Sequence, residues 1–172
     1  MALMVLSVVG SDRPGLTKAL AAAVVSAGGN WLESHLSQLG GLYVGSVLVE
    51  LASDGVDGLR SAVRTVDAHG LEVRIVPAVE GIGATGEALH FGLVGQDRPG
   101  IVNQVTEVLS RLGANIETFE THVDAEPHSG MPLFHMDARL RLPPELRAGE
   151  VQAALEEISA EIMIDISLTL AP

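Results

Sequence analysis

Several residue types are scarce or absent in this 172-residue chain, and each absence excludes a class of protein. There is no cysteine, so the chain can form neither a disulfide scaffold nor a Cys-ligated zinc or iron–sulfur site, and it has no thiolate nucleophile. Aromatic residues make up 3% of the chain, too few for a platform that stacks single-stranded bases. The only lysine is Lys18, and 10 basic residues against 22 acidic ones give a net charge of −12. We therefore expect no direct binding to nucleic acid, because phosphate recognition needs a basic cluster.

The chain also lacks a long apolar run. No segment reaches the roughly 18–20 apolar residues of a membrane-spanning helix. The first residues lack the basic segment and cleavage site of a secretory signal peptide. We therefore expect a cytoplasmic protein without membrane contacts. A hydrophobic content of 47% and a mean hydropathy of +0.34 are nevertheless sufficient for one medium or two small packed domains.

A six-residue sequence occurs twice in the chain. GSDRPG at 10–15 returns as GQDRPG at 95–100, 85 positions later. The same offset aligns further residues without a gap, namely Gly28 with Gly113 and Asn30 with Asn115. Such a match is not expected by chance, so the chain is interpreted as two copies of one unit.

The hydrophobic pattern of each copy predicts the element order βαββαβ. An aliphatic strand precedes each repeated loop, and a helix with one apolar stripe follows it and ends at Gly28 or Gly113. Two further strands form a hairpin, with a polar insertion at 124–132 in the second copy. A second helix, near 55–69 or 145–160, then leads to a closing strand. This order is the ferredoxin-like split βαβ arrangement, an α+β fold in which helices cover one face of an antiparallel sheet.

The repeat also predicts the domain organisation. We expect a first domain over residues 1–80, a linker over 81–86 and a second domain over 87–172. A unit of about 85 residues has a limited core and unpaired sheet edges. The two copies are therefore expected to pair side by side as one continuous sheet, and a homo-oligomer is expected as well.

The repeated loop is suited to holding an anion. We expect Pro14 and Pro99 at the first helical position, where the missing N–H costs no hydrogen bond. The following glycine, Gly15 or Gly100, lets another group approach the backbone. The helix N-terminus then offers free N–H groups and a partial positive charge to a carboxylate or phosphate.

Two polar residues accompany each loop. Asp12 and Asp97 lie within the loops, and an asparagine, Asn30 or Asn115, follows each aspartate by 18 residues at the start of a strand. An amide can donate and accept hydrogen bonds at once, which suits the amino and carboxylate groups of an amino acid. The alternative is that the aspartates only cap the helices and the glycines only serve the turns. The candidate ligand-binding residues are Asp12, Arg13, Pro14, Gly15, Asn30, Asp97, Arg98, Pro99, Gly100 and Asn115.

At these residues the chain resembles the ACT domain, a regulatory amino-acid-binding module, over both of its halves. In that family the loop ends in a glycine, here Gly15 and Gly100, and the aspartate and asparagine positions contact a bound amino acid. Two ACT units usually pack side by side, so the resemblance implies that the aspartate loop of one copy faces the asparagine of the other. Some members have a histidine two positions before the loop's acidic residue, where this chain has Gly10 and Gly95.

The tandem layout is similar, more narrowly, to the glycine cleavage system transcriptional repressor group. Two further segments match that group more weakly than the repeated loops do, namely GMPLFHMDARLRLP at 130–143 and DISL at 165–168. The resemblance implies a non-enzymatic regulator of transcription or metabolism that binds an amino acid and needs no cofactor. It would act through a protein partner, such as a DNA-binding activator, which agrees with the acidic composition.

Other functions stay open. His122, His128 and His135 flank the insertion, so a metal site is conceivable, but partly solvated loop histidines are the commoner explanation and we expect no metal. Glu117 and Glu120 are expected to be ordinary strand positions, which gives no support to paired-carboxylate catalysis. An ACT module of an enzyme, a small hydrolase such as a ferredoxin-like acylphosphatase, and a protein-interaction module without a ligand are the alternatives.

Overall fold

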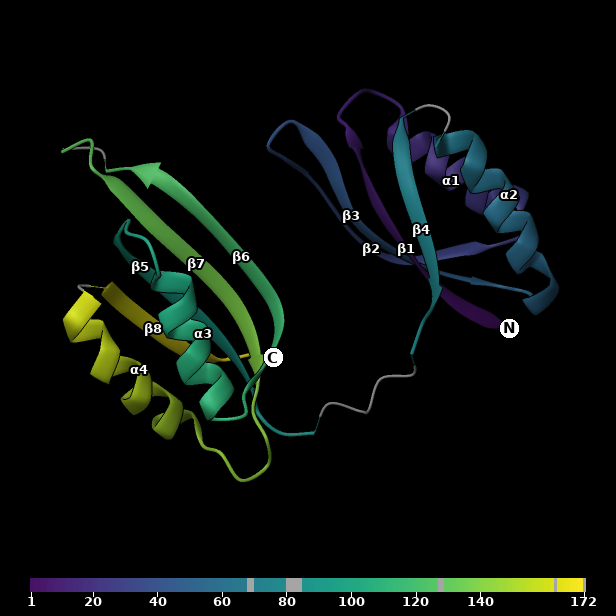
Figure 1. The fold of residues 1–172 in the computed structure, drawn as a ribbon. Helices are drawn as coiled ribbons and strands as arrows, with labels where there is room; N and C mark the ends of the chain where they lie inside the picture. Colours follow the sequence, from purple (N-terminus) through teal and green to yellow (C-terminus); the bar gives the residue numbers. More distant parts are fainter. Residues whose placement is uncertain (68–69, 80–84, 127–128, 163, 172) are drawn as a thin grey trace. The chain divides into compact units, whose positions relative to one another are not determined.

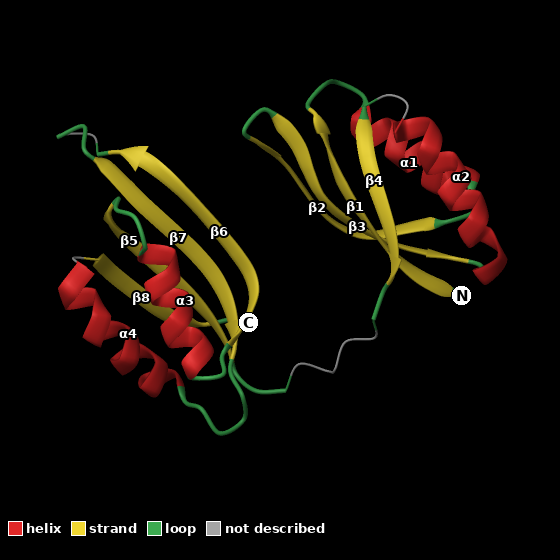
Figure 2. Cartoon of the chain, in the orientation of Figure 1, coloured by secondary structure: helices red, strands yellow, loops and turns green. Residues whose placement is uncertain are grey.

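The structure is a computed structural model that describes all residues except 68–69, 80–84, 127–128, 163 and 172. It divides the chain into two compact units, residues 1–80 and 81–172. Each unit is a four-stranded antiparallel sheet with two helices on one face (Figure 1 and Figure 2). The predicted α+β fold of two ferredoxin-like βαββαβ units is thereby confirmed, and the side-by-side pairing of the units stays a prediction.

The first unit has four strands and two α-helices. In chain order they are β1 (Ala2–Ser11), α1 (Leu16–Ser26), β2 (Asn30–Leu39), β3 (Leu42–Leu51), the 3-10 turn η1 (Ser53–Gly55), α2 (Val56–Asp67) and β4 (Leu71–Pro77). The strand order is β2-β3-β1-β4, so β2 and β4 are the edges of the sheet.

The second unit repeats this arrangement. Its elements are β5 (Ala88–Gln96), α3 (Ile101–Arg111), β6 (Asn115–Ala125), β7 (Pro132–Arg141), α4 (Ala148–Ile162) and β8 (Ile164–Leu170). The strand order β6-β7-β5-β8 matches that of the first unit. Both copies of the sequence therefore form the same topology.

Each unit has its own apolar core between its sheet and its helices. Alternate strand residues point toward the helices, because successive side chains of a strand lie on opposite faces. The buried clusters include Leu6, Leu20 and Leu59 in the first unit and Phe91, Leu109 and Leu155 in the second. No described element of the same unit covers the opposite face of either sheet, which we call the open face.

Gly28 and Gly113 follow the C-caps of α1 and α3, as predicted. Their φ angles are 69° and 74°, in the left-handed region that favours glycine. The N–H of Gly28 donates to the carbonyl of Val25, and the next N–H donates to the carbonyl of Val24. These two bonds form a Schellman motif, and Gly113 begins the same motif by donating to Ser110.

The second helix of the second unit begins later than predicted. The expected start near residue 145 is wrong by a few residues, because α4 begins at Ala148. The side chain of Glu150 accepts a hydrogen bond of 3.0 Å from the backbone N–H of Arg147. A glutamate that reaches back from the third helical position to the N-cap is one half of a capping box, and it places the helix start here.

Both ends of the predicted insertion belong to strands. β6 continues to Ala125 and β7 begins at Pro132, so the loop at the tip of the hairpin is shorter than the expected range of 124–132. His128 lies outside the described residues, as do most of the predicted linker and the expected helix end at residue 69.

Gly28→Ala is expected to lower the free energy of unfolding by about 1–2 kcal/mol, the cost of a β-carbon in the left-handed region. A β-carbon at Gly28 meets no atom within 4 Å, so the loss arises from the backbone and not from a clash. Gly58→Ala, in α2, is the matched control, because a β-carbon there also meets no atom and the backbone is helical. It should raise stability by about 0.5–1 kcal/mol. Urea unfolding measures both, and a shift in the same direction for both variants would contradict this explanation.

Candidate functional site

The two repeated loops have the same backbone conformation. Gly15 and Gly100 are the N-cap residues of α1 and α3, and both have a φ of 96°. Neither helix has a side-chain hydrogen bond at its cap. A β-carbon at either glycine would meet no atom within 4 Å, so the space above each helix start is open. The two loops therefore present the same uncapped N-terminus.

The prolines lie earlier than predicted. α1 begins at Leu16 and α3 at Ile101, so Pro14 and Pro99 precede the N-cap instead of occupying the first helical position. The physical reason is the glycine that follows each proline. A residue with a φ of 96° cannot be part of a right-handed helix, so the helix starts only after it.

The aspartates do not cap the helices by a side-chain hydrogen bond, so that part of the alternative is wrong. The backbone N–H of Asp12 donates to the carbonyl of Gly41 at 3.2 Å, and that of Asp97 donates to the carbonyl of Pro132 at 3.0 Å. These bonds attach each loop to the hairpin of its own unit. Both aspartates are exposed.

The two arginines are held differently. Arg98 donates from Nη2 to Oε1 of Gln104 in α3 at 3.0 Å, so its side chain lies over the first turn of that helix. Its Nε is buried and has no hydrogen-bond partner in the described part of the chain. Arg13 is exposed, and Ala19, at the position that matches Gln104, cannot accept the equivalent bond. The first loop thus has the more accessible arginine.

Within each unit, the loop and the asparagine lie at opposite ends of the sheet. In the first unit Ser11, which precedes the loop, faces Leu42 at one end of β3, and Asn30 faces Glu50 at the other end. The separation is about 26 Å, because Leu42 and Glu50 are eight residues apart on one strand and each residue rises about 3.3 Å. The second unit repeats this register. A loop and an asparagine of the same unit are therefore too far apart to contact one ligand.

Both asparagines are followed by a β-bulge. The register between β2 and β3 shifts at Leu32, and the register between β6 and β7 shifts at Glu117. A bulge redirects the side chain of the extra residue, so the prediction that Glu117 is an ordinary strand position is wrong. The two bulges lie 85 positions apart, and the repeat thus includes the backbone irregularity.

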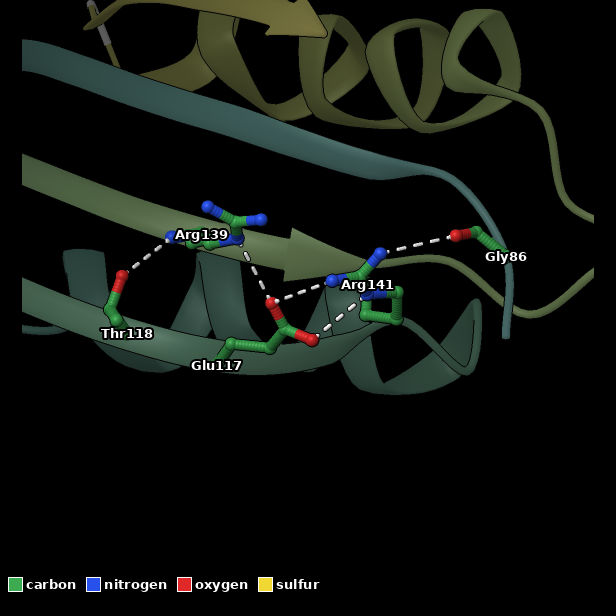
Figure 3. Close-up of polar contacts among 5 residues, drawn as sticks. All are labelled: Gly86, Glu117, Thr118, Arg139 and Arg141. Atoms are coloured by element: carbon green, nitrogen blue, oxygen red, sulfur yellow. Dashed lines mark hydrogen bonds and ion pairs between the residues drawn. The ribbon is translucent and has the colours of Figure 1, made fainter. Parts of the chain in front are cut away.

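Glu117 lies between two arginines of β7 (Figure 3). Arg141 donates from Nε to Oε1 of Glu117 at 2.9 Å and from Nη2 to Oε2 at 3.3 Å. Arg139 donates from Nε to Oε2 at 3.1 Å. Arg141 also donates to the carbonyl of Gly86 at 3.3 Å, and the backbone N–H of Arg139 donates to Oγ1 of Thr118 at 3.1 Å. The hydrogen bond from Arg141 is the main cause that lowers the pKa of Glu117 below its usual 4.5.

This cluster makes the surroundings of the two asparagines different. Arg141 faces Asn115, whereas Glu50 faces Asn30. Leu48 occupies the position in the first unit that Arg139 occupies in the second. The two arginines near Asn115 exceed the one carboxylate of Glu117 by one positive charge, whereas a glutamate faces Asn30. These arginines are not among the candidate residues predicted from the sequence, although their alternation on one strand places both on the same face.

The chain belongs to the ACT-domain family. The family model matches residues 2–76 and 91–169, one match in each unit. The crystal structure of an unknown protein from Galdieria sulphuraria is similar, with a TM-score of 0.87 and 33% identity over 99% of both chains. A candidate glycine cleavage system transcriptional repressor has a TM-score of 0.70 and 14% identity over 99% of this chain and 97% of its own, which shows a common fold. The search of curated proteins found no match.

The predicted resemblance to ACT domains is confirmed by these comparisons. No described helix is long and apolar enough to cross a membrane.

Glu117→Gln is expected to make stability less sensitive to acid. Because the arginines lower its pKa in the folded state, the Glu117 carboxylate stabilises folding above the unfolded pKa of about 4.5. This stabilisation is lost as the pH falls through the lower folded value. The decrease in melting temperature between about pH 7 and pH 3 should therefore be smaller in the variant than in the parent. Glu120→Gln, on the same strand, is the control. An equal decrease in the parent and in Glu117→Gln would contradict a stabilising role for the cluster.

Proposed function

We propose that this ACT-domain protein is a regulatory module that binds an amino acid and acts through a protein partner. The observation that carries the proposal is the uncapped helix N-terminus at Gly15 and again at Gly100, each beside open space. Backbone N–H groups and the helix dipole favour a carboxylate at such a position. Membership of a family whose modules bind amino acids supports the same assignment.

Each ligand site is proposed to combine two units. The loop at 12–15 is completed by Asn115, and the loop at 97–100 is completed by Asn30, either within one chain or between chains of a homo-oligomer. This combination is required by the distance between loop and asparagine within each unit. We also propose that the site with Asn115 binds more tightly, because Arg141 faces Asn115 and the arginine of the first loop is exposed.

The downstream role follows from the charge of the chain. A net charge of −12 repels nucleic acid, so the proposed regulator contacts a protein, such as a DNA-binding transcription factor, and not DNA. We propose a cytoplasmic location and no catalytic activity.

A protein-interaction module without a ligand is the second candidate. It is favoured by the open face of the first sheet, where Val9 and Leu42, on adjacent strands at one end of the sheet, are 39% and 41% exposed. Exposed apolar side chains that share a face are a common feature of protein-binding surfaces. This candidate becomes the better explanation if the protein binds none of the twenty amino acids.

Titration with the twenty amino acids, with melting temperature as readout, is expected to identify at least one ligand. A ligand at 100 times its dissociation constant adds about 2.7 kcal/mol of stability. Asn115→Ala removes a hydrogen bond to a charged group, worth roughly 1.5–3 kcal/mol, so calorimetry should show an affinity about ten- to a hundredfold lower. Asn30→Ala should have a smaller effect, and Gln152→Ala, on α4, is the control. Unchanged affinity in both asparagine variants would contradict the proposed sites.

Gly15→Ala tests whether the open space at the loop is used by a ligand. Like Gly28→Ala, it places a β-carbon at positive φ where no atom lies within 4 Å, so both variants should lose a similar free energy of unfolding, about 1–2 kcal/mol. Only Gly15→Ala should also weaken amino-acid binding, as measured by calorimetry. Asp12→Ala should weaken binding with little effect on stability, since Asp12 is not a helix cap. Equal affinities for Gly15→Ala and Gly28→Ala would show that the loop is only a turn.

A further inference from the structure

Two histidines face each other on the open face of the second sheet. His122 of β6 pairs directly with His135 of β7, and their rings are stacked with centroids 4.6 Å apart and an interplanar angle of 2°. Asp124, two residues farther along β6, is on the same face, and its Oδ2 is 3.2 Å from Nε2 of His122. One ligand atom from each of the three residues lies within 4.8 Å of the other two.

The side chains of this cluster are accessible. The side chain of His122 is 56% exposed and that of Asp124 is 65% exposed, so both can rotate toward a bound ion. Zinc lies about 2.0–2.2 Å from nitrogen and oxygen ligands, which places the ligand atoms about 3–4 Å apart. The two rings are parallel, so binding requires them to turn until their nitrogens point at one ion. The backbone already holds the two imidazoles opposite each other, because cross-strand β-carbons lie about 4.5–5.5 Å apart.

The surroundings of the cluster favour a cation. The neighbouring cross-strand pair consists of two acids, Glu120 and Asp137, on the same face. Like charges directly opposite each other on a sheet are destabilising, and a bound cation offsets part of this repulsion. Arg139, the next basic side chain along β7, is hydrogen-bonded to Glu117.

We propose that His122, Asp124 and His135 bind one divalent transition-metal ion, with water in the remaining coordination positions. Two imidazole nitrogens and one carboxylate oxygen are a donor set that Zn²⁺ and Ni²⁺ accept. Mg²⁺ and Ca²⁺ prefer oxygen ligands alone, so the site discriminates against them. This site is separate from the amino-acid sites proposed above and does not depend on them.

The first unit offers an internal comparison. In its edge strand β2, His35 lies 3.1 Å from Glu33, the same histidine–carboxylate spacing of two residues. Ser46 faces His35 there, so the second imidazole is missing. The proposal therefore predicts strong metal binding only in the second unit.

Calorimetric titration of the full chain without an affinity tag tests the site, with ZnCl₂, NiCl₂ and MgCl₂ as separate probes. We expect one Zn²⁺ per chain, binding of Ni²⁺ at the same site, and no binding of Mg²⁺. His122→Ala and His135→Ala should each weaken Zn²⁺ binding at least tenfold. Even the loss of a residue that only hydrogen-bonds to a metal ligand lowers metal affinity by about 10–100-fold. His35→Ala is the matched control and should bind Zn²⁺ like the parent.

A variant that creates a second metal site provides a further test. Its expected result is a gain of binding, which damage to the fold would not produce. Ser46→His places a second imidazole opposite His35, so a folded variant is expected to bind two Zn²⁺ ions per chain. Circular dichroism verifies that each variant is folded. The proposal is overturned if the parent binds no Zn²⁺ or if the folded His122→Ala and His135→Ala variants bind it as tightly as the parent. A folded Ser46→His variant that still binds one ion would also contradict it.

Discussion

The left-handed glycine at the start of α1 and of α3 is the constraint on which the candidate amino-acid site depends. At a φ of 96° the backbone of Gly15 or Gly100 cannot be helical, so the helix begins abruptly after it, with no side-chain cap. A β-carbon at either position would project into open space. The same residue thus sets the helix start, leaves the first N–H groups without a side-chain cap and keeps the space beside its own α-carbon free. A conventional N-cap serine or aspartate would satisfy one of those groups internally.

The strand order separates the loop from the asparagine within each unit. In a sheet with the order β2-β3-β1-β4, the loop after β1 and the start of β2 lie one strand length apart. A single unit therefore cannot bring Asp12 and Asn30 to one ligand, and in the proposed site a second unit supplies the missing partner. The two halves have also diverged. Arg141 faces Asn115, but Glu50 faces Asn30, and this difference underlies the proposed inequality of the two sites.

Features that depend on local sequence were predictable. The repeat, the element order and the helix ends at Gly28 and Gly113 follow from periodicity and from glycine as a C-terminal signal. The predicted helix starts at Pro14 and Pro99 are two residues too early, because the glycine after each proline has a left-handed conformation. That conformation depends on how the loop attaches to the hairpin. The clusters around Glu117 and His122 join adjacent strands, and they depend on a register that the sequence does not reveal. The sequence favours partly solvated loop histidines over a metal site, because only the strand pairing brings His122 opposite His135.

In the proposed amino-acid site, one ligand contacts the loop of one unit and the asparagine of another. A ¹H–¹⁵N NMR titration with the amino acid that most raises the melting temperature tests it most directly. We predict that the backbone amides after Gly15 and the side-chain amide of Asn115 shift together, with the same midpoint. Shifts at the loop while the side-chain amides of Asn30 and Asn115 stay unmoved would contradict a site shared between units.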